Sequence, residues 1–220
     1  MSFVSKITMD DAKVKFGSLS LNNQYQVHFA GLNGDVIQYL RFTKRIDNAQ
    51  DFISRETGIL CSDASLPASA YATAEVKDNF IGVPQEFVHS RLYTDIDFTF
   101  YVDEDYTVLN IFEGWMDYIT SGAEAEVDDL QKPFYRRLRY PDTYKVSSMY
   151  ISKFEKNLDR AITYQFINAF PKSITPIPVT YGSADLLKVS VSFNYDRYIV
   201  NRKQRQPSLL STVFNLFTGF

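Results

Sequence analysis

Period-two alternation of apolar and polar residues is the feature that most constrains this chain. Within residues 95–102, large hydrophobic side chains occupy every second position and polar or smaller ones fill the positions between them. Segments 24–30, 162–166 and 187–195 alternate in the same way, and 148–154 does so more weakly. Because successive side chains of a strand point to opposite faces, this pattern predicts half-buried β-strands. We therefore expect a mainly β fold.

An Asn-Gly pair follows the first of these segments. Asn33-Gly34 lies between Gln24–Ala30 and the apolar segment Val36–Phe42. Both residues of such a pair tolerate positive φ, which the tight turns of hairpins require. We therefore expect Val36–Phe42 to be the returning strand of a β-hairpin.

One segment has helical rather than strand periodicity. Apolar residues recur at helical spacing in Tyr106–Thr120, directly after the acidic cluster Asp103–Asp105. Carboxylates at this position can accept hydrogen bonds from the open N–H groups of a helix and complement its dipole. We expect one amphipathic helix here, with Phe112, Trp115 and Ile119 packed against the sheet.

Composition excludes several classes of protein. The chain has 220 residues, a net charge of −3 and a single cysteine, Cys61. One cysteine cannot form an internal disulfide or a Cys-based zinc site, and a net acidic chain is a poor candidate for tight nonspecific phosphate binding. No run of 18 apolar residues and no signal-peptide pattern is present. We therefore expect no transmembrane helix, and folding in the cytoplasm.

Catalytic and cofactor-binding patterns are missing from the sequence. His28 is expected on the polar face of a strand and His89 in a loop, and neither has an evident positioned partner. The carboxylates Asp95 and Asp97 and the cluster 103–105 lack calcium-loop spacing, and a solvated strand face and a helix cap explain them. We therefore predict no enzyme activity, no metal and no cofactor.

Two stretches beyond the expected strands are candidate interfaces. Ala123–Pro141 begins acidic and becomes basic and aromatic, which favours a protein interface, with internal salt bridging or single-stranded nucleic acid binding as alternatives. Asn201–Phe220 begins basic and continues, after Pro207, as an apolar stripe at helical spacing. We expect the stripe to dock on another chain; packing on its own barrel is the alternative. The candidate subunit or partner interface residues are Arg136, Arg137, Arg139, Leu209, Leu210, Val213, Phe214 and Phe217.

Several short motifs follow one another in a particular order. Leu66-Pro67 precedes a D-x-D-F strand at 95–98, which leads into a helix with F-x-x-W-x-x-x-I at 112–119. A late F-x-x-A-F-P segment at 166–171 is followed by a strand of alternating Val, Ser, Phe and Tyr at 189–195. In order and spacing, residues 20–200 resemble the tail tube proteins of contractile-tailed bacteriophages.

This resemblance implies a fold and an assembly. The implied fold is mainly β with one flanking α-helix, a β-barrel or two-sheet sandwich of the tail-tube type, which we assign to residues 1–200. The amphipathic C-terminal tail at 201–220 lies beyond the last expected strand and departs from the family. The assembly is a homohexameric ring that stacks on adjacent rings through extended loops, forming a hollow conduit in the virion tail, assembled in the host cytoplasm. The implied partners are the tail sheath, tape measure and baseplate hub proteins, without a membrane. DNA passes through the lumen without specific binding.

Other roles are compatible with the same sequence. The family also includes baseplate tube initiators, and a docking tail at 201–220 suits an initiator as well as a tube subunit. From another class, a ligand-binding β-module could use the aromatic residues as stacking platforms, and a hydrolase would need a site that the sequence does not reveal. The net charge of −3 fits a lumen that repels phosphates.

Overall fold

Two compact units make up the chain in the computed structural model, which describes residues 13, 19–43, 46–77, 82–120, 138–155, 161–182 and 184–203. Unit 1 comprises residues 1–25, 153–162 and 202–220, and unit 2 comprises 26–152 and 163–201. Within unit 1 the Phe154 amide donates a hydrogen bond to the Gln24 carbonyl at 2.9 Å. The buried core lies in unit 2, to which the following description applies.

Strands predominate, and helices flank them. The strands are β1 (Tyr25–Phe29), β2 (Cys61–Ala64), β3 (Ala70–Val76), β4 (Gln85–Leu92), β5 (Ile96–Tyr101), β6 (Val146–Phe154), β7 (Ala161–Ile174), β8 (Lys188–Asn194) and β9 (Arg197–Lys203). The helices are α2 (Gly34–Thr43), α3 (Ala49–Asp51), α4 (Thr57–Leu60), α5 (Thr107–Ile119) and α6 (Pro141–Tyr144), with a π-helical turn at Phe52–Glu56. The predicted fold class, mainly β with a flanking helix, is confirmed. Over the described ranges, every helix is too short or too polar to cross a membrane.

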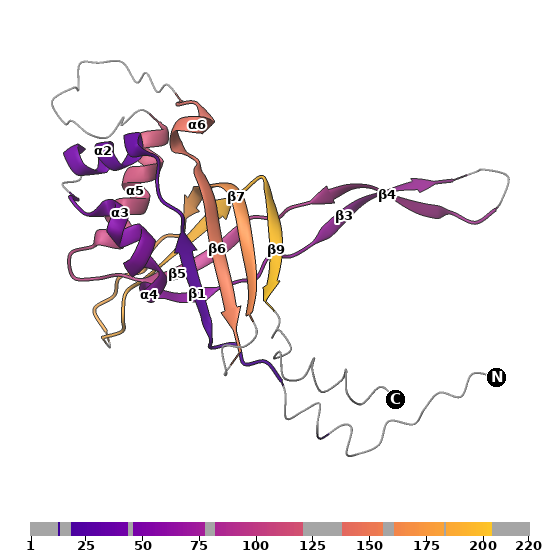
Figure 1. Ribbon diagram of the computed structural model, residues 1–220, viewed down its shortest axis with the longest axis horizontal. Helices are drawn as coiled ribbons and strands as arrows, with labels where there is room; N and C mark the ends of the chain where they lie inside the picture. The colour runs from indigo at the N-terminus through magenta and orange to yellow at the C-terminus, as the bar shows by residue number, and fades with distance from the viewer. Residues whose placement is uncertain are drawn as a thin grey trace, which may run out of the picture. The chain divides into compact units, whose positions relative to one another are not determined.

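Seven of the described strands form the main sheet. Their order is β1-β6-β7-β8-β5-β2, and β9 pairs with β7 off this path. Strands β5 and β8 are antiparallel, with Phe98 opposite Val191 and Phe100 opposite Val189. All four of these side chains are buried, as the alternation in the sequence predicts. In Figure 1, helices α2, α3 and α5 lie together beside this sheet.

A bend separates β8 from β9, which both pair with β7. Asn168 of β7 has a φ of 56°, a conformation that Asn tolerates better than most residues. Its side-chain amide donates to Asp196 Oδ2 at 2.7 Å, and the Asp196 amide donates to the Ile167 carbonyl at 3.0 Å. After the bend, β9 continues to Lys203. The expectation that the last strand ends before Asn201 is therefore wrong by three residues, Asn201–Lys203.

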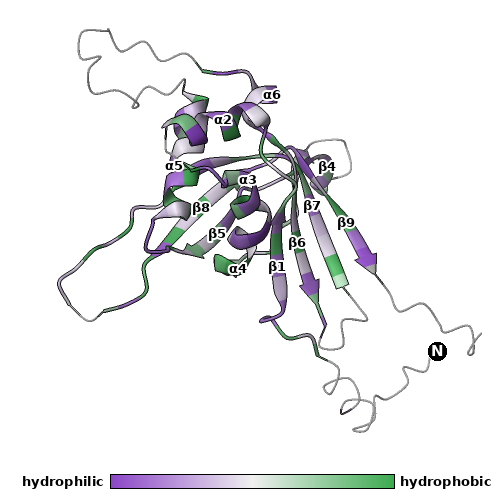
Figure 2. Ribbon diagram, turned by 60° about the vertical axis from the view of Figure 1, so that its left-hand side comes forward, coloured by the Kyte–Doolittle hydropathy of each residue, from purple (hydrophilic) through white to green (hydrophobic). Residues whose placement is uncertain are grey.

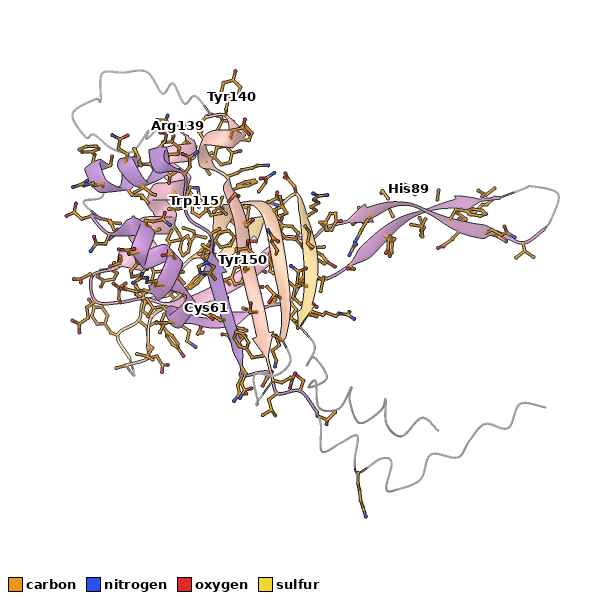
Figure 3. All side chains as sticks on the ribbon, viewed as in Figure 1. Cys61, His89, Trp115, Arg139, Tyr140 and Tyr150 are labelled. Carbon is orange, nitrogen blue, oxygen red and sulfur yellow. The ribbon has the colours of Figure 1, made fainter. Side chains whose placement is uncertain are left out.

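Helix α5 packs on the sheet as predicted. Its Phe112 ring lies 5.2 Å from that of Phe100 and 5.7 Å from that of Phe193, between ring centroids. Trp115 is fully buried beside Phe193 and donates a hydrogen bond from Nε1 to the Tyr144 carbonyl at 2.8 Å. The predicted acidic cap is also present, because Asp103 Oδ1 accepts from the Thr107 amide at 2.9 Å. Figure 3 shows Trp115 between the helices and the sheet.

The predicted hairpin after β1 is wrong, because residues 34–43 form helix α2. Asn33 begins this helix: its side-chain oxygen accepts from the Asp35 amide at 3.1 Å, and its carbonyl accepts from Ile37. Val36 and Leu40, four residues apart, are both fully buried. The Asn-Gly pair therefore acts as a helix start, and the apolar residues follow helical spacing.

The sequence also predicted too few helices. The segment from α3 through the π-helical turn to α4 lies against β1, which is an edge strand of the main sheet. A Cβ atom at Gly58 would lie 2.2 Å from the Val27 carbonyl oxygen, and His28 Nδ1 lies 3.0 Å from the Ser54 carbonyl oxygen. The segment therefore covers an edge that would otherwise be open to pairing. Figure 2 shows polar and apolar residues interspersed along it.

Substitution of Gly58 by alanine is expected to destabilise the protein by about 1–3 kcal/mol, because the new methyl group has no space beside the β1 backbone. The shift in the urea unfolding midpoint measures this loss. Gly34→Ala is the matched control, since a Cβ atom there meets nothing within 4 Å. Equal midpoints for Gly58→Ala and the wild type would contradict the close approach of this helical segment to β1.

Candidate functional site

Strands β3 and β4 form a separate hairpin, here called the arm, which projects from the main sheet (Figure 1). Every residue of β4 is exposed. The arm also exposes large apolar side chains: Tyr71 is 57% exposed, Phe87 54% and Val88 61%. An isolated two-stranded hairpin is only marginally stable in water, and exposed apolar groups of this kind are typical of protein interfaces. The arm therefore has the character of a segment that contacts another chain.

The arm corrects one prediction. His89 lies on strand β4, where Figure 3 labels it, and not in a loop. The sequence hides these strands because β3 is rich in alanine, and because Glu75 and Glu86 stand opposite each other as like charges. In the sequence, Gly82 and the nearby Pro84 are the turn signals between the two strands. In the structure, Gly82 has a positive φ.

The root of the arm, defined as Ser69, Arg91, Tyr93 and Tyr198, joins the arm to β9. Arg91 Nη2 donates to the Tyr198 hydroxyl at 2.8 Å and to Ser69 Oγ at 3.1 Å. The Arg91 guanidinium carbon lies 5.0 Å from the Tyr198 ring centroid and 5.2 Å from that of Tyr93. Ser69 and Tyr198 also share a hydrogen bond between their hydroxyls. The root is thus a charged and aromatic contact between the arm and the main sheet.

The outward sides of β5 and β8 form a second surface, here called the polar face, which comprises Asp97, Thr99, Ser190 and Ser192. Thr99 pairs with Ser190 and Asp97 with Ser192 across the two strands. The Thr99 and Ser190 hydroxyls lie 2.9 Å apart in a hydrogen bond. Lys188, at the start of β8, lies over the Tyr101 ring at 5.0 Å. The polar face therefore presents hydroxyls and a carboxylate on the side of these strands opposite the buried phenylalanines.

Asp95, which directly precedes β5, has structural partners. Lys172 donates to Asp95 Oδ2 at 2.5 Å and Asn194 donates to Oδ1 at 2.8 Å. The Lys172 hydrogen bond is the main reason that the pKa of Asp95 is held below its usual value. Across the described ranges, no three metal-ligating side chains gather in one place.

A cleft of about 470 Å³ is lined by polar groups that bond to one another. Asp196 accepts hydrogen bonds from Asn168 and from Lys145, whose Nζ lies 3.0 Å from Asp196 Oδ1. These two bonds, that of Asn168 above all, hold the pKa of Asp196 below its usual value. The polar groups of the cleft thus stabilise the bend between β8 and β9.

His28 and Cys61 have local partners. His28 lies on the exposed side of β1, as predicted, and its ring contacts the Ser54 carbonyl and the Tyr150 ring. Cys61 is buried, and its Sγ lies 3.3 Å from the Asp63 carbonyl oxygen. These contacts, to the Ser54 carbonyl, the Tyr150 ring and the Asp63 carbonyl, do not pair a nucleophile with a base.

Of the predicted interface residues, the structure describes Arg139. Its Nε donates to the Tyr118 carbonyl at 2.9 Å, and its guanidinium lies 4.1 Å from the Tyr118 ring centroid. Arg139 therefore contacts helix α5 of its own chain, while the neighbouring Tyr140 is exposed (Figure 3). The remaining candidates, Arg136, Arg137, Leu209, Leu210, Val213, Phe214 and Phe217, lie outside the described residues.

A buried carboxylate joins helices α2 and α5. Tyr39 donates its hydroxyl hydrogen to Asp117 Oδ2 at 2.5 Å, and Asp117 is only 7% exposed. The other carboxylate oxygen, Oδ1, is buried without a hydrogen-bond partner among the described residues. Burial, and then the hydrogen bond to Asp117, raise the pKa of Tyr39 well above its ordinary value of 10.0.

Stability is therefore expected to fall in alkali. Below the unfolded-state pKa, Tyr39 is protonated in both states and its contribution is fully present; above about pH 10 the unfolded chain loses this proton while the folded chain keeps it. Tyr39→Phe should lose less stability than the wild type between about pH 8 and pH 11, as measured by urea midpoints. Burial raises the pKa of Tyr195 to about 12. Tyr195 is present in both proteins, so its contribution to the pH dependence cancels in the comparison. Equal losses in both proteins would refute the role of Tyr39.

Comparison with known proteins identifies the family. The family model described as phage tail tube protein matches residues 20–201. No protein with a curated description matches the sequence. Similar solved structures include a sheath/tube terminator of the PVC extracellular contractile injection system in its extended state, with 15% identity, 83% of this chain and 96% of that chain covered, and a TM-score of 0.48. They also include Hcp1 from Salmonella typhimurium, with 8% identity, coverage of 83% and 94%, and a TM-score of 0.36. Because the family model spans the arm and the seven-stranded main sheet, the chain belongs to the phage tail tube protein family.

Proposed function

We propose that this chain is the subunit of a bacteriophage contractile-tail tube, assembling as hexameric rings that stack into a hollow conduit for DNA. The observation that carries the proposal is the family match over residues 20–201. Tail tube proteins have a structural role, so we propose no catalytic activity for this chain.

The arm supports stacking between rings. Phe87 and Val88 expose more than half of their surface, which would be buried by contact with another chain. Burying such side chains gives roughly 1.5–3 kcal/mol each before ordering costs. A second copy of this chain in the adjacent ring is the partner that a self-assembling tube provides for every arm.

The polar face of β5 and β8 is proposed to line the lumen. Its hydroxyls form hydrogen bonds within the sheet, as between Thr99 and Ser190, and Asp97 adds negative charge. A surface of this kind repels phosphates or leaves them unbound, whereas clustered Lys and Arg would hold DNA in place. Lys172 is one of the lysines near the polar face, and its positive charge is paired with the carboxylate of Asp95.

Other contacts complete the proposal. The exterior of the tube would contact the tail sheath, and its lumen would contain the tape measure protein. One end of the tube would contact the baseplate hub. Arg136, Arg137 and the stripe Leu209–Phe217 are proposed for these or for subunit contacts. A baseplate tube initiator is the second candidate, because the sequence of that stripe suits docking to a hub.

Negative-stain electron microscopy of the purified chain tests this function. Hollow tubes are expected for a tube subunit. Single rings that lengthen only on a preformed template would indicate the initiator instead. Monomers at high concentration, with neither rings nor tubes, would overturn both assignments and favour a ligand-binding module.

A further inference from the structure

Few of the described side-chain hydrogen bonds join the arm to the main sheet. Over the residues that the structure describes, the arm forms its own two-stranded sheet and shares no ladder with the main sheet. Among the described residues, the side-chain hydrogen bonds that join Ser69 and Arg91 to the main sheet all end at the Tyr198 hydroxyl. The Tyr198 hydroxyl on β9 therefore receives the side-chain hydrogen bonds from both sides of the arm's base, beside the contacts of the Tyr93 ring with the Tyr195 and Tyr198 rings.

The Tyr198 ring is itself held firmly. It contacts the rings of Phe166, Tyr164 and Tyr195, with centroids 6.2, 5.9 and 6.4 Å away. Phe166 is fully buried and lies 4.8 Å from the Tyr195 ring. Tyr198 thus connects the core of the main sheet to the exposed Arg91.

Arg91 suits this connection better than a lysine would. Its planar guanidinium lies over two rings, those of Tyr93 and Tyr198, while one of its nitrogens donates to two hydroxyls. Stacking and directed hydrogen bonds together restrict both the distance and the orientation of β4. The ammonium group of a lysine, a point charge on a flexible side chain, would restrict only the distance between β4 and the main sheet.

We propose that Arg91 and Tyr198 form a latch that fixes the direction of the arm relative to the main sheet. Arg91 and Tyr198 therefore position the arm, and any effect on assembly comes through the arm. The consequence for assembly rests on the proposed function: an arm whose direction is already fixed loses less conformational freedom when it reaches a neighbouring subunit.

Distances between two spin labels test the latch directly. One label is placed by Glu86→Cys on β4 and the other by Ser147→Cys on β6, both exposed positions, in a Cys61→Ala background. Labelled chain is diluted into excess unlabelled chain, so that only distances within one chain are measured. We expect one narrow distance peak for this background.

Tyr198→Phe removes the shared hydroxyl and keeps the ring, and we expect it to replace the narrow peak by a broad distribution. Arg91→Lys keeps the charge without the planar fork and should broaden the peak as well. Tyr164→Phe is the matched control, because it removes a hydroxyl from the neighbouring ring and should leave the peak narrow. Unchanged urea midpoints would show that the broadening reflects the arm's direction and not loss of the fold. A narrow peak in both Tyr198→Phe and Arg91→Lys would overturn the latch.

Tube yield separates the latch from the proposed function. If the two latch variants broaden the peak and also lower tube yield, the latch and its role in assembly are both supported. If the peak broadens and tube yield is unchanged, the role in assembly is overturned. If the wild type forms no rings or tubes, the proposed function fails, while the distance distributions still decide whether the latch exists.

Discussion

Replacing Trp115 with alanine is expected to lower the free energy of unfolding by about 3–5 kcal/mol, because a large buried side chain leaves a cavity that the surroundings fill only partly. Trp115 has no exposed surface, contacts the Phe193 ring and bonds to the Tyr144 carbonyl. Urea unfolding followed by circular dichroism measures the loss at a fixed chain concentration. Fluorescence is unsuitable, because Trp115 is the single tryptophan of the chain.

Trp115→Phe is the control for this substitution. It retains most of the apolar volume and loses the indole N–H bond to Tyr144, so its loss of stability should be clearly smaller than that of Trp115→Ala. A loss below about 1 kcal/mol for Trp115→Ala would mean that helix α5 does not anchor the core.

Truncating the arm is expected to abolish tube formation and to leave the subunit folded. Replacing residues 73–89 by Asn-Gly, a favourable two-residue turn, keeps the Ala72–Ser90 pair and the root of the arm. The fold should survive because every residue of β4 is exposed, so the arm adds little to the buried core. Circular dichroism reports the fold, and sedimentation with electron microscopy reports assembly.

His89→Ala is the matched control for the truncation, since it changes one exposed polar residue of the arm and should assemble normally. Tubes of normal yield from the truncated chain would contradict the role of the arm in stacking. Loss of the circular dichroism spectrum would show instead that the arm is required for folding.

The sequence predicted the elements in which one periodicity dominates. In β5 and β8, strict alternation places the phenylalanines and valines inward, and both strands are found. Helix α5 was predicted because its apolar residues recur at helical spacing after a carboxylate cap, and Asp103 does cap it. In these elements local pattern and tertiary packing agree.

Other elements depend on contacts that no local pattern reveals. The apolar residues of α2 fit a short strand as well as a helix, and burial of Val36 and Leu40 decides between them. Gly58 gives no sign in the sequence that the β1 backbone lies against it. The bend at Asn168 depends on Asp196, a residue 28 positions away in the sequence, so no local pattern reveals it.

The candidate site was the least predictable part. The arm has a weak strand pattern because every residue of β4 is exposed, so neither face of that strand has to be apolar. No pattern in the sequence points to Tyr198 and Arg91, because they are 107 residues apart and come together only in the folded chain. Arg139 of the basic run contacts Tyr118 of its own chain, and the interface expected for this run stays a prediction.

A cryo-electron microscopy reconstruction of the assembled chain would show how its subunits are arranged. We expect a closed hexameric ring in which Asp97 and Ser192 of the polar face line the channel and each arm contacts a subunit of the adjacent ring. A ring whose channel is lined by helix α5, or arms that contact no other subunit, would contradict this expectation.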